Sequence, residues 1–259
     1  MKPIGDAGAR ASPRSLPDLA PEQRRILVVN AKGGCGKTTL ATNLAALYAS
    51  MAVDTALVDH DPQGSSSQWL KARDESRPAI QGIAPWKEAS AGHTTRTFQM
   101  RLAFSARRVV IDTPAALSAS DFGRWLGEAD RILIPVLPSS IDIKAGARFI
   151  GDLLLDRQYR QRPIPLAVVA NRVRRNTVVF QKLERFLRSL RIPFVATFRD
   201  LQGYVRAAEV GDGLFELPRG RDQQEWEAFT RLLTWVEATD RWRGARGTTA
   251  SDSLGPSVS

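Results

Sequence analysis

The sequence predicts an α/β fold: a doubly wound, mostly parallel sheet with helices on both faces. Short apolar runs alternate with helical stretches over most of the 259 residues, as expected where helices connect parallel strands. Runs such as Val109-Val110-Ile111 are apolar throughout, which is typical of strands buried on both faces. Polar residues end four of the runs, where such sheets bind ligands: Asn30, Asp59, Asp112 and Asn171.

The expected strands and helices alternate up to residue 210, and a final helix follows. We expect strands at Arg25–Asn30, Thr55–Asp59, Arg108–Asp112, Arg131–Val136, Leu166–Asn171 and Phe194–Thr197, with a weaker strand at Ala79–Ile83. We expect helices at Lys37–Ser50, Ser65–Arg73, Thr94–Ala106, Ser118–Glu128, Ile141–Gln158, Thr177–Leu190, Gln202–Val210 and Gln223–Ala238. The last helix carries one apolar face, which we expect to pack on the core: Trp226, Phe229, Leu233 and Val236.

Composition indicates one domain, over residues 25–243. An apolar fraction of 43% is ordinary for a globular chain of this length. Residues 1–24 and 244–259 are rich in Pro, Gly and Ser without periodicity, so we expect disordered tails. The single cysteine excludes a disulfide framework and fits a reducing cytosol. No apolar run reaches the roughly 18 residues of a membrane span, so we expect a cytoplasmic protein.

A glycine-rich turn connects the first expected strand to the first expected helix. Residues 31–38 read Ala-Lys-Gly-Gly-Cys-Gly-Lys-Thr and meet the pattern GxxxxGK[ST] except at its first glycine. In such a turn backbone N–H groups point at phosphate oxygens, the helix N-terminus and Lys37 add positive charge, and the Thr38 hydroxyl can ligate Mg²⁺. We predict a P-loop NTPase fold that binds a nucleoside triphosphate through Gly33, Gly34, Cys35, Gly36, Lys37, Thr38 and Thr39.

Two other interpretations of this turn are weaker. An ordinary flexible turn does not require Gly-Lys-Thr-Thr at the head of a helix that follows a buried strand. A helix N-terminus can lower the pKa of a thiol, which would suit a redox or catalytic role for Cys35. The chain has no second cysteine to resolve an oxidised Cys35, so we interpret it as a small residue that fits the turn.

Two carboxylates end the second expected strand, in the run Asp59-His60-Asp61-Pro62-Gln63-Gly64. We assign Asp61 to catalysis, where it orients and deprotonates the attacking water or holds the water shell of the metal. Asp59, still on the strand, braces the Mg²⁺ ligands. A local Asx turn or a helix cap is the alternative for Asp61. Strand alternation turns His60 away from both neighbours, so we interpret it as structural.

A third run, Val109 to Pro114, is an apolar strand that ends in Asp112. This is the arrangement in which a Walker B aspartate reaches Mg²⁺ through water. The strand order of P-loop folds brings such a strand next to the phosphate turn. We therefore predict a metal site composed of Thr38, Asp59 and Asp112.

Taken together, these motifs resemble the ParA/MinD family of deviant Walker ATPases. The resemblance rests on Lys32-Gly33-Gly34-Cys35-Gly36-Lys37-Thr38-Thr39, then Asp59-His60-Asp61-Pro62-Gln63-Gly64, then Ile111-Asp112-Thr113-Pro114. It extends over about residues 25–240, through the runs at 129–136, 170–172, 199–204 and 213–217. Ala115 stands where the family usually has a second proline, which we expect to alter a loop rather than the chemistry.

The resemblance implies a slow, partner-stimulated ATPase that forms a sandwich dimer around ATP and Mg²⁺. Lys32 is then the signature lysine, which reaches the phosphates of the ATP on the partner subunit, and hydrolysis dissolves the dimer. A second cation aimed at a triphosphate gains most when another subunit supplies it. Asn171 matches the family position that contacts adenine, with Arg172 beside it. An asparagine that ends a strand before a turn is an equally good interpretation.

The charge of the chain favours a polyanionic partner. The formal net charge is +10, from 30 arginines and 7 lysines against 27 acidic residues, and residues 157–206 alone carry twelve basic and two acidic residues. Guanidinium groups pair with phosphates and release counterions, so we expect non-specific DNA binding. A solvated basic face is the alternative for any one arginine. The candidates for DNA contact are Arg172, Arg174, Arg175, Arg185, Arg188, Arg191 and Arg206.

Within the family, the sequence favours the ParA-like branch, whose members position plasmids, chromosomes or protein cargo over the nucleoid. The resemblance then implies a nucleoid-associated protein, with a ParB-like or cargo adaptor that stimulates hydrolysis. Residues 61–66 followed by Trp69 resemble members that distribute large protein assemblies. With 24 residues before the first strand, we expect no helix-turn-helix domain.

The alternative is a MinD-like ATP switch, bound to a membrane or to a partner, that regulates cell division or flagellar placement. Such a protein shares every motif above. The Gly- and Ser-rich C-terminal tail lacks the basic amphipathic periodicity of a membrane-binding helix, so we expect no membrane contact.

Overall fold

The computed structural model describes residues 16–85, 105–115, 119–174, 181, 185, 192–218 and 222–238. Seven strands form one sheet in the order β3-β2-β4-β1-β5-β6-β7, and every neighbouring pair is parallel. The predicted doubly wound parallel sheet is therefore confirmed. The strands are β1 (Arg24–Val28), β2 (Thr55–Asp59), β3 (Gln81–Ile83), β4 (Arg108–Asp112), β5 (Arg131–Val136), β6 (Leu166–Val173) and β7 (Phe194–Arg199).

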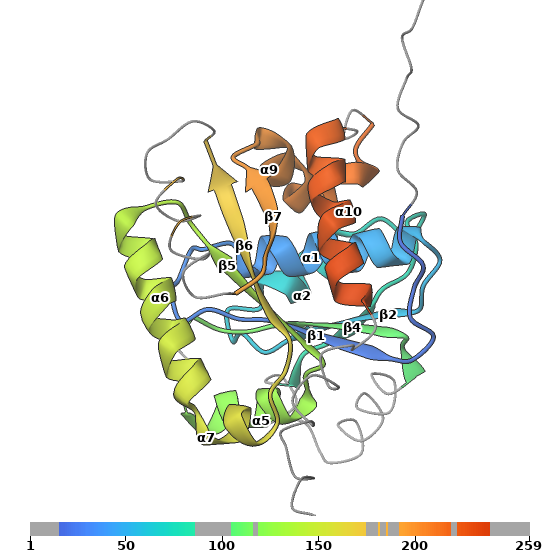
Figure 1. Cartoon of the computed structure of the whole chain (residues 1–259). Coiled ribbons are helices and arrows are strands. Elements are labelled where there is room, and N and C mark those ends of the chain that lie inside the picture. Colours follow the sequence, from blue (N-terminus) through green and yellow to red (C-terminus); the bar gives the residue numbers. More distant parts are fainter. Residues whose placement is uncertain are drawn as a thin grey trace, which may run out of the picture.

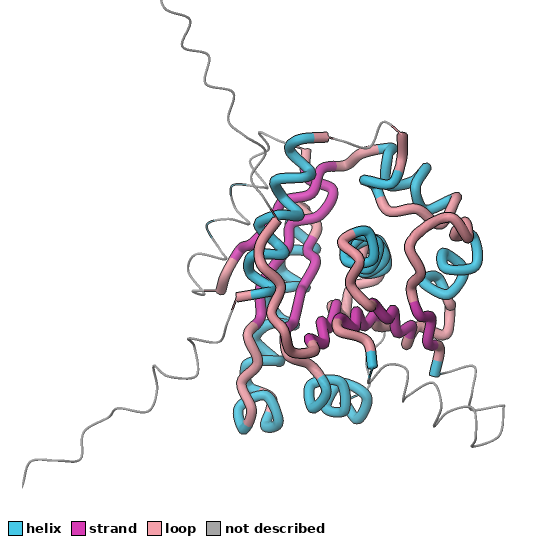
Figure 2. The backbone as a smooth tube through the Cα atoms, turned by 90° about the vertical axis from the view of Figure 1, so that its right-hand side faces the viewer, coloured by secondary structure: helices cyan, strands magenta, loops and turns pink. Residues whose placement is uncertain are grey.

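Helices cover both faces of this sheet (Figure 1). One face is covered by α5 (Ala119–Glu128), α6 (Ser140–Leu155) and α7 (Arg157–Gln161). The other face carries α1 (Lys37–Ser50), α2 (Ser65–Ala72), α9 (Gln202–Glu209), the short 3₁₀ helix η1 (Leu214–Glu216) and α10 (Gln223–Glu237). The turned view in Figure 2 shows the strong twist of the strands between these two layers.

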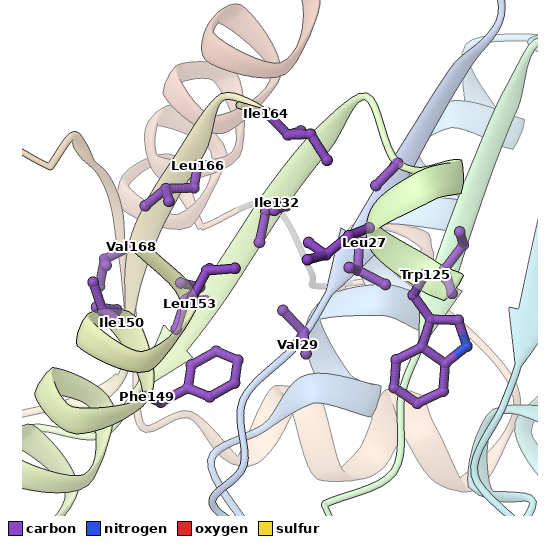
Figure 3. Packing of buried hydrophobic residues seen from close by; sticks show 14 of the residues in the cluster. Leu27, Val29, Trp125, Ile132, Phe149, Ile150, Leu153, Ile164, Leu166 and Val168 are labelled. Atoms are coloured by element: carbon purple, nitrogen blue, oxygen red, sulfur yellow. The ribbon is translucent and has the colours of Figure 1, made fainter. Parts of the chain in front are cut away.

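Each face of the sheet has its own cluster of buried apolar side chains, and the two clusters contain alternate residues of the same strands. In β1, Leu27 faces the α5 and α6 layer, whereas Ile26 and Val28 face the α1 and α10 layer. This is the two-residue period of a strand buried on both sides. Figure 3 shows Leu27 among side chains from neighbouring strands and from α5 and α6, including Trp125 and Phe149.

Most of the expected elements lie where the sequence predicts them, and one helix differs. The expected helix at 141–158 is split into α6 and α7 at Asp156, whose backbone is not helical (φ −59°, ψ 135°). The Asp156 carboxylate accepts the N–H groups of Gln158 and Tyr159 and so caps α7. The expected helices at 94–106 and 177–190 lie largely outside the described residues, as does the expected tail at 244–259. The expected tail at 1–24 is described from residue 16, where Leu16 and Leu19 pack on the core and Ala20 is buried, so this part is not a disordered tail.

A buried charge network fastens the edge of the sheet where the strands begin. Arg108, at the start of β4, pairs with Glu237 at the end of α10, with 2.5 Å between Nη2 and Oε2. The Tyr48 hydroxyl donates to Glu237 at 2.6 Å, and the Ala20 N–H donates to it at 3.0 Å. Burial pushes the pKa of Glu237 upward, but the hydrogen bonds from Arg108 and Tyr48 outweigh burial and leave that pKa lowered.

Candidate functional site

The glycine-rich turn lies between β1 and α1, at the carboxyl edge of the sheet. Gly34 and Gly36 have φ values of 75° and 90°, in the left-handed region that favours glycine. A Cβ atom on Gly36 would lie 1.9 Å from Nδ2 of Asn171, so no larger residue fits there without movement. The turn therefore presents bare backbone, which is what close approach to a phosphate requires.

Two asparagines brace this turn, Asn30 just after β1 and Asn171 on β6. Asn30 Nδ2 donates to the Pro135 carbonyl at 2.8 Å, and Asn30 Oδ1 accepts the Lys32 N–H at 3.1 Å. Asn171 Nδ2 donates to the Cys35 carbonyl at 3.0 Å. Asn171, which the family resemblance predicts to contact adenine, is thus buried against the turn itself. Arg172, next to it, is exposed and adopts a positive φ of 51°.

The two lysines of the turn have opposite surroundings. Lys37 is only 7% exposed, and its Nζ donates to the Lys32 carbonyl at 3.3 Å, inside the turn. The Lys32 side chain is exposed and makes no ion pair with a described residue. Lys37 is therefore held inside the turn, whereas the Lys32 side chain lies exposed on its surface.

Cys35 behaves as a structural thiol. Its side chain is fully buried, and Sγ donates to the Lys32 carbonyl at 3.2 Å. Burial raises the pKa of the thiol, and the charge of Lys37 offsets this only in part. A raised pKa keeps the thiolate scarce, which agrees with a packing role.

Asp112 lies beside the first turn of α1 and is fully buried. Its Oδ2 atom accepts the hydroxyls of Thr38 at 2.8 Å and of Ser66 at 2.6 Å, whereas its Oδ1 atom is buried and has no hydrogen-bond partner among the described residues. Burial raises the pKa of Asp112 to about 6, although the hydrogen bonds from Ser66 and Thr38 act in the opposite direction. A buried carboxylate oxygen without a partner indicates a missing cation or donor.

The carboxylates of Asp59 and Asp61 have different hydrogen-bond partners from that of Asp112. Asp59 is buried and satisfied, because Oδ1 accepts the Asp61 N–H at 3.1 Å and Oδ2 accepts the N–H and the hydroxyl of Ser67 at 2.8 and 2.7 Å. Asp61 is half-buried, and its Oδ1 accepts the Gln63 N–H at 2.9 Å, which is the Asx turn of the alternative interpretation. The His60 ring packs on Trp125, with 5.2 Å between centroids, so it turns away from both carboxylates.

These donors fit a hard divalent cation that arrives with a nucleotide. The described residues contain no cluster of three or more His, Cys, Asp and Glu side chains that would form a metal site of its own. Mg²⁺ is usually held by one or two carboxylates together with phosphate oxygens and water. The Oδ1 of Asp112, which has no partner among the described residues, and the adjacent Thr38 hydroxyl match that donor set. The hydrogen bonds of Asp59 go to Asp61 and Ser67 rather than to these two residues.

The arginines predicted to contact DNA fall into two groups. Arg172 and Arg174 at the end of β6, Arg185, and Arg206 on α9 are exposed, and Arg174 Nη2 lies 3.2 Å from Asp200 Oδ2. Arg175, Arg188 and Arg191 lie outside the described residues. The basic segment does not form a single surface, because α7 carries Arg157 and Arg160 at the opposite end of β6 (Figure 1).

Sequence reasoning missed two residues of this site. Ser66 and Ser67 each donate a hydroxyl to a strand-end carboxylate, but serines at a helix start are also common as caps. The motif Asp-Pro-Gln-Gly followed by three serines carried no signal that separated these roles. Only the hydrogen bonds from α2 to Asp112 at the end of β4 and to Asp59 at the end of β2 assign them.

A parallel sheet with a glycine-rich turn after its central strand, and a buried aspartate on the adjacent strand, defines a nucleotide-binding protein of the P-loop NTPase class. Residues 26–214 match the family model described as the CobQ/CobB/MinD/ParA nucleotide binding domain. The chain belongs to this family, and within it to the ParA-like deviant Walker ATPases.

Relatives and a solved structure agree with this assignment. A carboxysome distribution protein A ("Maintenance of carboxysome distribution protein A") of Gloeobacter kilaueensis is 33% identical over 229 residues, 85% of this chain and 96% of the relative. The protein of the same name from Halothiobacillus neapolitanus is 30% identical over 203 residues, 76% of this chain and 89% of the relative. The fold matches an ATP complex of a Cyanothece McdA variant with a TM-score of 0.63 and 14% identity, over 84% of this chain and 97% of that chain.

None of the helices in the described part of the chain is both long enough and apolar enough to cross a lipid bilayer.

Proposed function

We propose that this chain is a ParA-type ATPase that dimerises around two MgATP molecules, binds DNA without sequence preference, and positions a large protein assembly of the carboxysome class. The observation that carries the proposal is the contrast between the two lysines of the turn. Lys37 is buried within its own turn, whereas Lys32 is exposed and unpaired among the described residues. A cation presented in this way suits the phosphates of a nucleotide held by a second subunit.

The residues of the site divide the chemistry between them. Lys37 and the backbone of residues 33–38 hold the phosphates, and Thr38 and Asp112 hold the metal. MgATP, when bound, supplies the phosphoryl group that is transferred to water. Asp61 orients and deprotonates that water, and the free Oδ2 of its carboxylate supports this role because it has no partner among the described residues. Asp59 fixes the backbone of Asp61 through the 3.1 Å hydrogen bond.

The lysine assignment is tested with two single variants. Lys37→Ala should lose nucleotide binding by 100-fold or more, on the order of 3 kcal/mol of charge-assisted contact. Lys32→Ala should bind a non-hydrolysable ATP analogue with nearly unchanged affinity but remain monomeric. Titration calorimetry and light scattering measure the two properties separately. A Lys32→Ala protein that still dimerises with the analogue refutes the role in trans.

DNA binding is tested by its dependence on salt. Replacing Arg172 and Arg174 with alanine should weaken binding to any duplex and reduce the slope of log K against log salt by about 2, at roughly 0.9 per lost phosphate contact. The matched control is Arg157→Ala with Arg160→Ala, which removes the same charge from α7 at the other end of the sheet. Equal effects in both double variants would assign the binding to net charge rather than to this surface.

Cargo positioning is proposed because the two relatives above are named for carboxysome distribution. An Asp61→Ala protein should keep ATP without hydrolysing it and so retain its partners, which a pull-down followed by mass spectrometry identifies. Co-sedimentation of the same variant with DNA and with liposomes separates this proposal from a MinD-like membrane switch. Recovery with liposomes but not with DNA would favour the switch.

A further inference from the structure

Three consecutive serines at the start of α2 have three different surroundings. Ser65 is exposed, and its hydroxyl has no hydrogen-bond partner among the described residues. Ser66 is fully buried and donates to Asp112 on β4, at 2.6 Å. Ser67 donates to Asp59 on β2, at 2.7 Å. One turn of helix thus holds two carboxylates that belong to two different strands of the sheet.

The hydrogen bond from Ser66 fixes which oxygen of Asp112 is free. Oδ2 receives both Ser66 and Thr38, so the carboxylate has one satisfied oxygen and one buried oxygen without a partner. A Thr38 hydroxyl can ligate a metal with a lone pair while its proton still points at Oδ2. Ser66, in contrast, is not needed as a ligand; among the described residues, its hydroxyl bonds to Asp112 and so orients that carboxylate.

Helix α2 is a rigid support for this contact, because the helix and the residue after it are bound to η1 and to the segment before η1. Trp69 Nε1 donates to the Asp212 carbonyl at 3.1 Å, and the buried Arg73 pairs with Glu216 at 2.6 Å. Gly211 packs so closely that an added Cβ atom would lie 2.3 Å from the Arg73 backbone nitrogen. A hydroxyl held by a clamped helix has little freedom to leave its partner.

We propose that Ser66 is a positioning residue for the metal: it holds the Asp112 carboxylate beside Thr38, with Oδ1 unpartnered among the described residues, and it ties the loop of Asp61, which leads into α2, to the same carboxylate. The proposal rests on the proposed function, since it assumes that Asp112 receives Mg²⁺ with the nucleotide. Partners of this kind orient a ligand without touching the metal, and their loss typically costs 10- to 100-fold in metal affinity.

The test measures metal affinity rather than turnover. Wild-type protein and Ser66→Ala are titrated with Mg²⁺ at a fixed concentration of the non-hydrolysable analogue AMPPNP, and nucleotide affinity is measured again in EDTA. Ser66→Ala should need about tenfold more Mg²⁺ for half-maximal tightening. Its affinity in EDTA should stay close to that of the wild type, because the Ser66 hydroxyl bonds to Asp112 rather than to the phosphate-binding turn. Its melting temperature should fall, because the buried Asp112 carboxylate loses one hydrogen bond.

Matched controls lie on either side of Ser66. Ser65→Ala should match the wild type, since its hydroxyl is free. Ser67→Ala should shift the Mg²⁺ midpoint less, because Asp59 keeps the N–H of Ser67 and that of Asp61. An unchanged midpoint in Ser66→Ala, or an equal loss of affinity in EDTA, would overturn the proposal.

If the Ser66→Ala protein folds poorly, a double-mutant cycle with Asp112→Asn provides a second test. In an Asp112→Asn background, the Ser66→Ala change should add no further shift of the Mg²⁺ midpoint, because the carboxylate that it orients is gone. An additive shift contradicts the proposal. Wild-type protein whose AMPPNP affinity does not respond to Mg²⁺ at all would instead refute the proposed function, so the two failures are distinguishable.

Discussion

Strand β4 begins and ends with a fully buried charge, and the protein treats the two charges in opposite ways. Arg108, at its start, donates five hydrogen bonds, to Glu237, Ala20, Glu22 and Arg107. Asp112, at its end, accepts two hydrogen bonds from described residues on one oxygen and none on the other. A satisfied buried charge stabilises one structure, whereas an incompletely satisfied one has capacity left for a ligand.

The largest effect should come from breaking the satisfied end. Arg108→Ala leaves the Glu237 carboxylate buried without its cation, so the free energy of unfolding should fall by about 3–5 kcal/mol. Chemical denaturation measures the loss. The control is Arg148→Ala, which removes an exposed arginine 4.0 Å from Asp152 and should cost less than about 0.5 kcal/mol. Similar losses in both variants would mean that the network at this edge is not a buried ion pair in solution.

At the other end of the strand, the charge on Asp112 should lower the free energy of unfolding instead of raising it. Because burial raises the pKa of Asp112 from 3.8 to about 6, this group favours folding below about pH 4, and the contribution disappears as the pH rises through 6. Relative to Asp112→Asn, the nucleotide-free wild type should lose on the order of 3 kcal/mol between pH 4 and pH 7, at about 1.4 kcal/mol per pKa unit. Denaturation of both proteins across this range measures the difference. A constant difference would show that Asp112 titrates normally.

A smaller effect should follow from filling the space beneath the turn. Gly36→Ala places a methyl group at a positive φ and against Asn171, which should lower the free energy of unfolding by about 1–2 kcal/mol. Adding Asn171→Ala removes the contact but not the backbone strain. The double variant should therefore recover only part of the loss, and full recovery would mean that the backbone strain contributes nothing.

The smallest effect should come from Lys32, whose exposed side chain makes no ion pair with a described residue. Lys32→Ala should change the free energy of unfolding of the monomer by less than about 0.5 kcal/mol, as is usual for an exposed side chain. Thermal denaturation in the absence of nucleotide measures this. A loss above 1 kcal/mol would show that Lys32 has an intramolecular partner, and it would weaken the role proposed for it between subunits.

The sequence predicted the architecture better than the connections within the site. Strands β2, β4 and β5 were predicted to the residue, because each is an apolar run that a polar residue or a turn ends sharply. The turn at residues 31–38 and the aspartate at the end of β4 were also recognisable from residue type and spacing alone. The break at Asp156 was missed because the apolar spacing continues through it, while a local side-chain cap decides the geometry.

The contacts that were not predicted join residues far apart in the chain. Ser66 and Asp112 are 46 positions apart, and Asn171 reaches Cys35 across 136 positions. Neither contact is visible in local composition, since serine at a helix start and asparagine at a strand end each satisfy an ordinary local rule. Such roles emerge only when the sheet order brings the elements together.

The hydrogen bond between Ala20 and Glu237 brings the entry and the exit of the folded core to one place, 217 positions apart in the chain. Because that place lies where the strands begin, a fluorescent reporter attached at either end stays clear of the glycine turn. A short linker from residue 238 to residue 19 should also close the core, so that new ends can be opened in a surface loop. Circular permutants of this kind offer a route to sensors in which nucleotide loading changes the emission of an inserted fluorophore.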